Sequence, residues 1–392
     1  MSTPGAPAPD DVRLARAYLS RVAEPPAAPL VAFVRAVGAV EAARRVRAGE
    51  QLPADVDAVT RARRRTDRAE SDLAAAAARG GRLLVPEDPD WPAAALRAFD
   101  GVTGTRDGDG GGGSDGIDLT PPLALWVRGV EDPTDAGRRS AAVVGARAAT
   151  DYGRHVAGHW SALLAEAGVT VVSGAALGID GAAHRGALAA EGTTVAVVAC
   201  GIDRPYPPAH TRLLDHVAAH GLVVSEYPPG TVPARHRFLV RNRLIAAWST
   251  GTVVVEAGAR SGARRTALCA RRLGRAVMAV PGPVTSASSL GCHALVREQE
   301  ATIAGRVTDV LEAVGSIGEL APDDPRPVRP TDGLPPEAAL LHEAVPLHAA
   351  RDEARLAHDA GVDPRRAAQA LVVLEDEGLV QRGTRGWIRR PE

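Results

Sequence analysis

The residues best suited to chemistry lie in one stretch of nine, RHRFLVRNR, at positions 235–243. Four of the nine are arginines, and they surround Phe238, one of only three phenylalanines among 392 residues. A guanidinium group binds a phosphate through paired hydrogen bonds, and an aromatic ring stacks on a base. The composition of this stretch therefore favours binding to a single strand of nucleic acid. Its apolar spacing also fits an ordinary core helix. The polar residues concerned are Arg235, Arg237, Arg241, Asn242 and Arg243.

The charge of the chain limits what such a site can be. Because the net charge is −1, nucleic acid would have to bind a local patch and not a global field. All 46 basic residues are arginines, so arginine content alone says little about phosphate binding. Their clustering is more informative, since ten arginines and a single carboxylate, Glu256, lie between Arg235 and Arg275.

Three cysteines, Cys200, Cys269 and Cys292, are widely spaced and form no CxxC pair, which argues against a disulfide framework or a zinc site. We expect no metal and no cofactor. The first thirty residues show no basic-then-apolar leader, and no apolar run is long enough to span a bilayer. These features predict a cytoplasmic protein that does not bind membranes.

Short apolar runs rich in β-branched residues alternate with segments of helical spacing from about residue 141 onward. This alternation is typical of a parallel sheet covered by helices on both faces. The fold class is therefore α/β, with a Rossmann-like, doubly wound core. The expected strands are at 121–129, 141–145, 169–173, 193–199, 222–226, 252–256 and 275–282.

Composition shifts divide the chain further. We predict a small N-terminal helical (SAM-like) domain at 1–80 with disordered first residues, the core at 81–318, a Pro-rich linker at 319–335 and a winged-helix domain at 336–392. A Gly-rich stretch at 101–116 is expected to be a flexible loop. The basic run RARRR at 61–65 fits a solvated helix face better than a DNA contact.

In such sheets, ligands bind outside the carboxyl ends of the strands. Glycine, serine and arginine recur there: the loop at 145–147 ends in Arg147, the next carries Ser173 and Gly174, and a later one is Arg260–Ser261–Gly262. We expect their amides and guanidinium groups to bind an anion, with Asp180 capping a helix. No GxGxxG, no P-loop and no nucleophile beside its base is found, so an enzyme is not expected.

Eight ordered motifs, among them GARAATDYG, SGAALGIDGAAHRGAL, FLVRNRLIA and VVVEAGARSGARRTA, closely resemble the DNA-processing protein A (DprA/Smf) family over about residues 83–314. The resemblance implies a homodimer that binds single-stranded DNA, protects it, and helps to load the RecA recombinase in natural transformation or homologous recombination. Single-strand-binding protein is implied as a further partner. The residues that match the family's DNA pocket are Arg147, Ser173, Gly174, Phe238, Arg241, Asn242, Arg243, Ser261 and Gly262, with Arg235 and Arg237 as its basic residues.

Two further expectations concern the ends of the core. Apolar residues at 290–303 have no obvious sheet partner and are expected to form the dimer interface: Leu290, Leu295, Val296 and Ile303. The winged helix carries ten carboxylates against eight arginines from residue 337 onward, which makes it a poor reader of duplex DNA.

The main alternative is a nucleotide-processing enzyme of the lysine-decarboxylase-like phosphoribohydrolase group, which shares this kind of sheet and a glycine-rich loop. That chemistry needs a carboxylate on the helix after the loop, and Ala257–Gly274 contains none. A scaffold role through the winged helix is the other alternative, and it predicts a core without DNA affinity.

Overall fold

The computed structural model of the chain describes residues 8–103, 117–315 and 331–390. It divides into two compact units, Met1–Ala321 and Pro322–Glu392. Residues 104 to 116, which are most of the expected Gly-rich loop, and residues 316 to 330, which include most of the linker expected at 319–335, lie outside the described residues.

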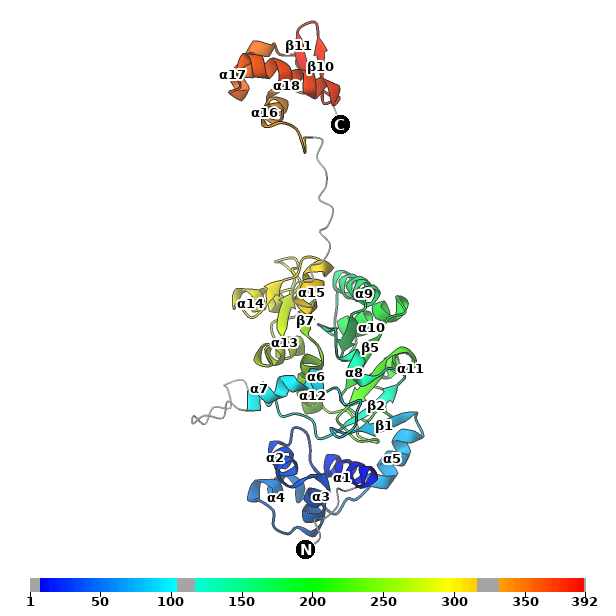
Figure 1. The fold of residues 1–392 in the computed structure, drawn as a ribbon. Helices are drawn as coiled ribbons and strands as arrows, with labels where there is room; N and C mark the ends of the chain where they lie inside the picture. The colour runs from blue at the N-terminus through cyan, green and yellow to red at the C-terminus, as the bar shows by residue number, and fades with distance from the viewer. Residues whose placement is uncertain (1–7, 104–116, 316–330, 391–392) are drawn as a thin grey trace. The chain divides into compact units, whose positions relative to one another are not determined.

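A nine-stranded sheet forms the middle of the first unit (Figure 1). Its strands are β1 (Gly81–Leu84), β2 (Leu125–Gly129), β3 (Ser140–Val144), β4 (Thr170–Ser173), β5 (Thr194–Val198), β6 (Leu222–Ser225), β7 (Gly251–Val254), β8 (Ala276–Ala279) and β9 (Thr302–Ile303). They lie in the order β1-β2-β6-β5-β4-β3-β7-β8-β9. Neighbours from β6 to β9 are parallel, as the sequence predicted, while β1 and β2 add an antiparallel edge.

Helices cover both faces of this sheet, which confirms the doubly wound α/β fold. They are α9 (Asp151–Glu166), α10 (Ile179–Ala189), α11 (Thr211–His220), α12 (Arg235–Trp248), α13 (Gly262–Arg272), α14 (Leu290–Arg297) and α15 (Val307–Val314). Successive side chains of a strand point to opposite faces. Ala141 and Val143 of β3 therefore pack with α9, α10 and α15, while Ala142 and Val144 belong to the core formed with α12 and α13.

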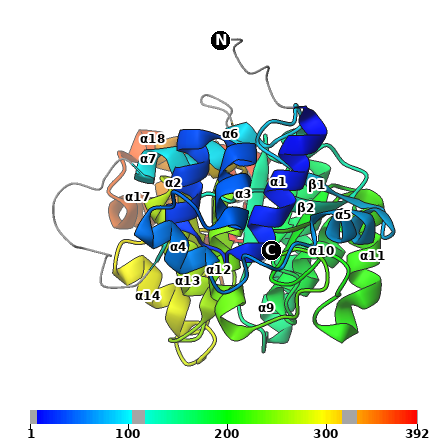
Figure 2. The same cartoon turned by 90° about the horizontal axis from the view of Figure 1, so that it is seen from below.

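Five helices precede the sheet: α1 (Pro9–Val22), α2 (Ala28–Val37), α3 (Ala39–Ala48), α4 (Ala54–Thr60) and α5 (Ala69–Ala77). Figure 2 looks onto them. Tyr18 and Leu19 of α1 share one apolar core with Leu83 and Trp126 of the two edge strands, so this helical layer is packed onto the sheet. The basic run at 61–65 is not on a helix face as predicted, because α4 ends at Thr60 and these residues form turns.

Short helical segments join the layers. They are α6 (Ala93–Leu96), η1 (Arg97–Phe99), α7 (Asp100–Thr103), α8 (Pro133–Ala136) and η2 (Pro208–His210). Phe99 and Leu96 are buried in the core that α12 and α13 share with the sheet.

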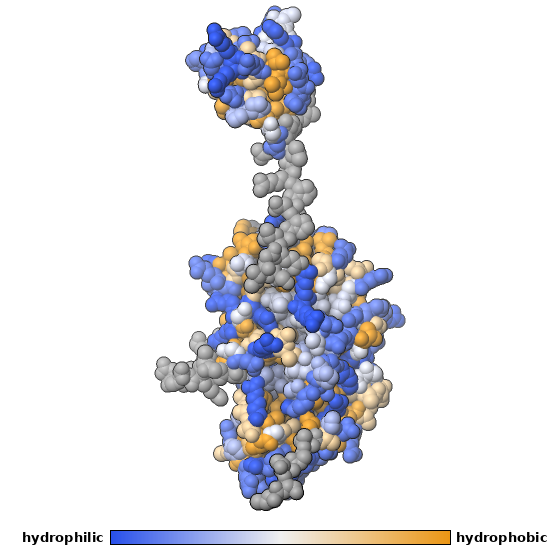
Figure 3. Space-filling view, in the orientation of Figure 1, coloured by the Kyte–Doolittle hydropathy of each residue, from blue (hydrophilic) through white to orange (hydrophobic). Residues whose placement is uncertain are grey.

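The second unit is the winged helix that the sequence predicted. It consists of α16 (Pro336–Ala344), α17 (Glu353–Ala360), α18 (Pro364–Asp376), β10 (Val380–Gly383) and β11 (Gly386–Arg389). The two strands form an antiparallel hairpin, and Trp387 joins Leu371 and Leu374 of α18 in a small core. Leu340, Leu347 and Val372 remain exposed, and the face drawn in Figure 3 includes apolar surface on this unit.

Candidate nucleic-acid interface

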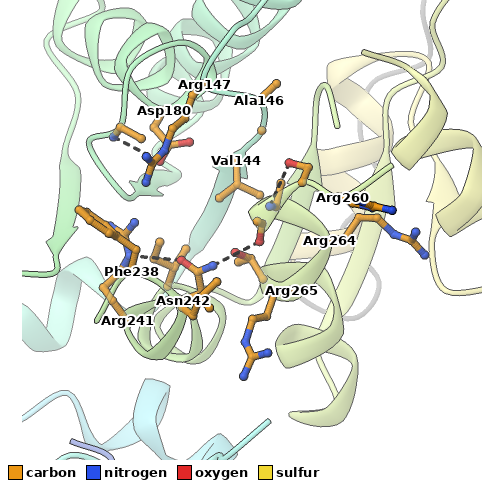
Figure 4. A pocket seen from close by; sticks show the side chains of 18 of the residues that line it. Val144, Ala146, Arg147, Asp180, Phe238, Arg241, Asn242, Arg260, Arg264 and Arg265 are labelled. Atoms are coloured by element: carbon orange, nitrogen blue, oxygen red, sulfur yellow. Dashed lines mark hydrogen bonds between the residues drawn. The ribbon is translucent and has the colours of Figure 1, made fainter. Parts of the chain in front are cut away.

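A hollow of about 1170 Å³ opens at the carboxyl ends of β3 and β7. The chain continues from β3 to β4 on one side, whereas β7 lies on the other side of β3, so the loops after these two strands diverge. Such a point of divergence is where open α/β sheets bind ligands. The walls come from the loop at 144–147, the start of α12 and the segment at 258–266, which face one another in Figure 4.

The lining of the hollow is strongly basic. Six arginines line it against two carboxylates, Asp180 and Glu300. The six are Arg147, Arg235, Arg241, Arg260, Arg264 and Arg265. Three of them, Arg147, Arg235 and Arg260, are exposed and pair with no carboxylate in the described part of the chain. Positive charge that is not neutralised inside a concave wall attracts an anionic ligand such as a phosphate.

An aromatic pair lies beside these arginines. Phe238 is half-buried in the wall, and the guanidinium carbon of Arg147 stands 5.0 Å from the centre of its ring. The ring of Tyr206 lies 5.4 Å from that of Phe238 and is tilted by 42°. Both rings line the hollow, so a flat ligand can stack where a phosphate can also be bound.

The two arginines in the first turn of α12, Arg235 and Arg237, have different surroundings. Arg235 lines the hollow. Arg237 instead donates two hydrogen bonds to Glu24, at 2.6 and 3.1 Å, and lies over the ring of Tyr227. Burial acts to raise the pKa of Glu24, but the hydrogen bonds from Arg237, Arg63 and His236 outweigh it and hold this pKa at about 2. Arg237 is therefore tied to the segment between α1 and α2 and does not line the hollow, although the sequence had placed it in the DNA pocket.

Arg243, in the third turn, differs from another expectation. Its side chain is 1% exposed and forms two hydrogen bonds of 2.8 Å to the carboxylate of Glu226. Its Nε donates to the carbonyl of Thr120 at 2.9 Å, and Phe99 lies 5.9 Å away. Three of its five N–H donors have these partners, and the whole side chain is buried, so DNA cannot reach it and Arg243 acts as a structural residue.

Arg241 is also buried, but it reaches the floor of the hollow. It donates to the carbonyls of Gly174, at 2.7 Å, and of Val197. The carboxylate of Asp180 accepts the amides of Gly174 and Ala176 at 3.2 and 3.4 Å. Burial raises the pKa of Asp180 and lowers that of Arg241, while the charge of each opposes the shift of the other.

The amides of the loop after β4 are thus already occupied by the chain's own Asp180 side chain. The open cradle expected at Ser173 and Gly174 is filled by Asp180, and the Ser173 hydroxyl is buried and donates to the carbonyl of Val143 at 2.7 Å. A side chain at Gly174 would meet the guanidinium of Arg241, so this glycine permits the close approach. We conclude that this loop supports the floor of the hollow from beneath.

At the start of α13, the residues lie where the sequence analysis expected them. Ser261 caps the helix by accepting the amide of Ala263 at 3.3 Å, and Arg260 and Gly262 are exposed at its mouth. Asn242 donates to the carbonyl of Gly262 at 3.2 Å and so ties α12 to the start of α13.

Among the lining side chains that are basic or aromatic, the sequence analysis did not identify Tyr206, Arg264 and Arg265. A signal existed for the arginines, because they lie in the first turn of the helix that follows the expected loop. Tyr206 lies in the sequence GIDRPYPP, where only its proximity to another strand end could have indicated a role. Arg264 also pairs with Glu298 at 2.9 Å.

The expected dimer edge needs one correction. Leu295 is 1% exposed within its own subunit and packs in the core, so it cannot contact a partner. Val296 is half-buried against the same core, and Ile303 has a sheet partner because β9 pairs with β8. Leu290 and Ile303 remain exposed, at 47% and 59%.

Across the residues that the structure describes, no helix has the length and apolar character needed to cross a membrane. The same residues contain no cluster of three or more histidine, cysteine, aspartate or glutamate side chains suited to a metal ion.

Comparison with known proteins supports the resemblance seen in the motifs. Residues 114–315 match the family described as DNA recombination-mediator protein A. A DNA processing protein DprA of Mycobacterium tuberculosis is 51% identical over 372 residues, which cover 95% of this chain and 93% of that protein. Protein Smf of Synechocystis is 32% identical over 252 residues, 64% of this chain and 58% of that protein.

The X-ray structure of DNA processing protein A from Streptococcus pneumoniae has a TM-score of 0.60 and 28% identity, covering 78% of this chain and 98% of that one. The family match at residues 114–315 includes the residues that line the hollow and every strand from β2 to β9. Motifs, sequence identity and fold therefore agree, and the chain belongs to the DNA recombination-mediator protein A (DprA/Smf) family.

Proposed function

We propose that this protein binds single-stranded DNA in the hollow, protects it, and helps to load the RecA recombinase on it. The observation that carries the proposal is the set of three exposed arginines without carboxylate partners, Arg147, Arg235 and Arg260, around the ring of Phe238. Guanidinium groups provide phosphate contacts, and the ring provides a surface on which any base can stack.

The shape of the site favours a single strand over a duplex. Phe238 is half-buried in the wall, so a base must enter the hollow to reach its ring. A base in a duplex is stacked on its neighbours and paired, whereas a base in a single strand can turn into the hollow. Asn242 uses its amide nitrogen on Gly262 and its oxygen on Arg241, so little is left to read base edges.

The wider role rests on the family. Recombination mediation, which is the family's description, supports RecA as a partner, with single-strand-binding protein as the protein that is displaced. A homodimer through the exposed Leu290 and Ile303 would place two hollows in one assembly. We assign DNA binding to the core at 81–318 and a secondary role to the winged helix at 336–392, whose charge is net acidic.

The test is a titration of the full-length protein with a short oligothymidylate at several salt concentrations. Three phosphate contacts predict that log affinity falls with log salt at a slope of roughly −2, about 0.7 per contact. Replacing Arg147, Arg235 and Arg260 together by alanine should bring this slope close to zero.

A matched control removes three arginines elsewhere. Arg44, Arg138 and Arg355 have 57%, 74% and 63% exposed side chains and do not line the hollow. Replacing these three by alanine changes the net charge equally and should leave the slope near its original value. Equal slopes for the two triple variants would show that DNA binds elsewhere.

A further inference from the structure

The turns at 61–65, RARRR, are the most basic short segment that the hollow does not include. Three of its arginines point outward: the side chains of Arg61 and Arg63 are 72% and 45% exposed, and Arg65 is exposed without an ion pair among the described residues. Arg64 differs, because it is largely buried and pairs with Asp57. We call the outward three, Arg61, Arg63 and Arg65, the basic turn.

A shared carboxylate places the basic turn beside the start of α12. Glu24 accepts a hydrogen bond from Arg63 at 2.8 Å and one from His236 at 3.2 Å, so these two side chains meet at one group. His236 is 62% exposed, and its neighbour Arg235 lines the hollow. The surface therefore continues from the hollow over His236 to the basic turn.

The local charge along this surface favours a phosphate chain. Residues 61–68 contain five arginines and one carboxylate, Asp67, which pairs with Arg47 at 2.8 Å. The negative charge of Glu24 is matched by Arg237, whose side chain is only 14% exposed. What remains facing solvent is positive, and exposed arginines are suited to the DNA backbone because guanidinium groups match phosphate geometry.

No aromatic residue lies within the basic turn, in contrast to the hollow with its two rings. Stacking is therefore confined to the hollow, and contacts at the turn can involve only the sugar-phosphate chain. Such contacts position a strand and strengthen its binding without reading its sequence.

We propose that a single strand leaving the hollow past Arg235 and His236 continues onto the basic turn, so that the N-terminal helices extend the DNA-binding path. This inference rests on the proposed function of the hollow. It makes affinity depend on strand length, because a short strand fills the hollow and only a longer one reaches Arg61, Arg63 and Arg65.

The experiment compares oligothymidylates of about 6 and about 24 nucleotides on the full-length protein; the first is the length of one single-strand site, and the second extends beyond such a site. The long strand should show a salt slope steeper than the short one by roughly 2, about 0.7 for each of three added phosphate contacts. Replacing Arg61, Arg63 and Arg65 by alanine should remove this difference and leave the affinity for the short strand unchanged. The Arg44, Arg138 and Arg355 triple variant should keep the difference.

Two results would overturn the proposal. One is a long-strand slope that the basic-turn variant leaves unchanged, since the path would then run elsewhere. The other is loss of short-strand binding in that variant, which would mean that the turn only supports α12 through Glu24. Absence of short-strand binding in the unaltered protein would instead refute the proposed function of the hollow, so the two failures are distinguishable.

Discussion

Two arginine–glutamate pairs lie less than two helical turns apart on α12 and differ in almost every physical respect. Arg243 and Glu226 are 1% and 6% exposed and are enclosed in the interior of the first unit. Arg237 and Glu24 are 14% and 29% exposed, and their pairing joins the sheet-bearing core to the N-terminal helices. Between them lies Phe238, which faces the hollow.

The difference shows that an arginine's role follows from the carboxylate within reach and from its burial. A buried pair cannot lose one member without leaving a charge in a medium of low polarity. A partly exposed pair can exchange its partner for water at little cost. Arg235 has neither kind of partner, and this leaves its guanidinium available to a ligand.

The largest expected effect comes from breaking the buried pair. Arg243→Ala leaves the Glu226 carboxylate buried without its cation and should lower the free energy of unfolding by about 3–5 kcal/mol. Urea denaturation of the full-length protein measures this loss. Binding of single-stranded DNA per folded molecule should not change, because Arg243 is enclosed on all sides.

A double variant serves as the control for that measurement. Arg243→Met with Glu226→Gln removes both charges and keeps most of the volume, so it should be less destabilised than Arg243→Ala. If Arg243→Ala proved as stable as the original protein but weaker in DNA binding, Arg243 would belong to the site and the comparison of the two pairs would fail.

The sequence predicted the sheet well because its signal is local. Strands β3 to β8 are short apolar runs, and each predicted run overlaps the observed strand. The position of the site at the strand ends followed from the same pattern, since parallel strands bring their carboxyl ends to one edge. Arg147, Phe238 and Arg260 line the hollow at that edge, and their part in DNA binding stays a prediction.

The roles of the other arginines could not be predicted, because they depend on partners far away in the chain. Arg237 pairs with a glutamate 213 residues away, and Arg243 reaches Thr120, 123 residues away. Motif letters such as RNR give the residue type but not its burial. The same limit applies to Leu295, whose apolar character fits a core and an interface equally well.

A smaller effect should follow from changing the ring between the two pairs. Phe238→Ala removes a stacking surface and should weaken binding of oligothymidylate by about 1–3 kcal/mol, with the salt slope unchanged. Phe238→Tyr keeps a ring and should retain most of the affinity. Lower thermal stability with unaltered binding per folded molecule would instead identify Phe238 as a core residue, the alternative that the amphipathic pattern left open.

The smallest effect is expected at the exposed pair, and it depends on pH. The pKa of Glu24 is lowered from 4.5 to about 2 in the folded protein, so its ionised form stabilises the fold above about pH 4.5. This contribution is lost as the pH falls toward 2, when the folded protein also binds the proton. Taken alone, a pKa shift of this size would correspond to roughly 3 kcal/mol. Water screens a partly exposed pair, and its side chains lose freedom when they are held together, so Glu24→Gln should cost only about 1 kcal/mol at pH 7.

Urea denaturation between pH 7 and pH 2 tests this expectation, with Glu166→Gln, at an exposed position, as the control. The difference between Glu24→Gln and the original protein should shrink as the pH falls, whereas Glu166→Gln should show little difference throughout. A loss of 3 kcal/mol or more at pH 7, comparable to that predicted for Arg243→Ala, would mean that the outer pair holds the fold together as firmly as the buried one. Exposure would then not be what separates the two arginines of α12.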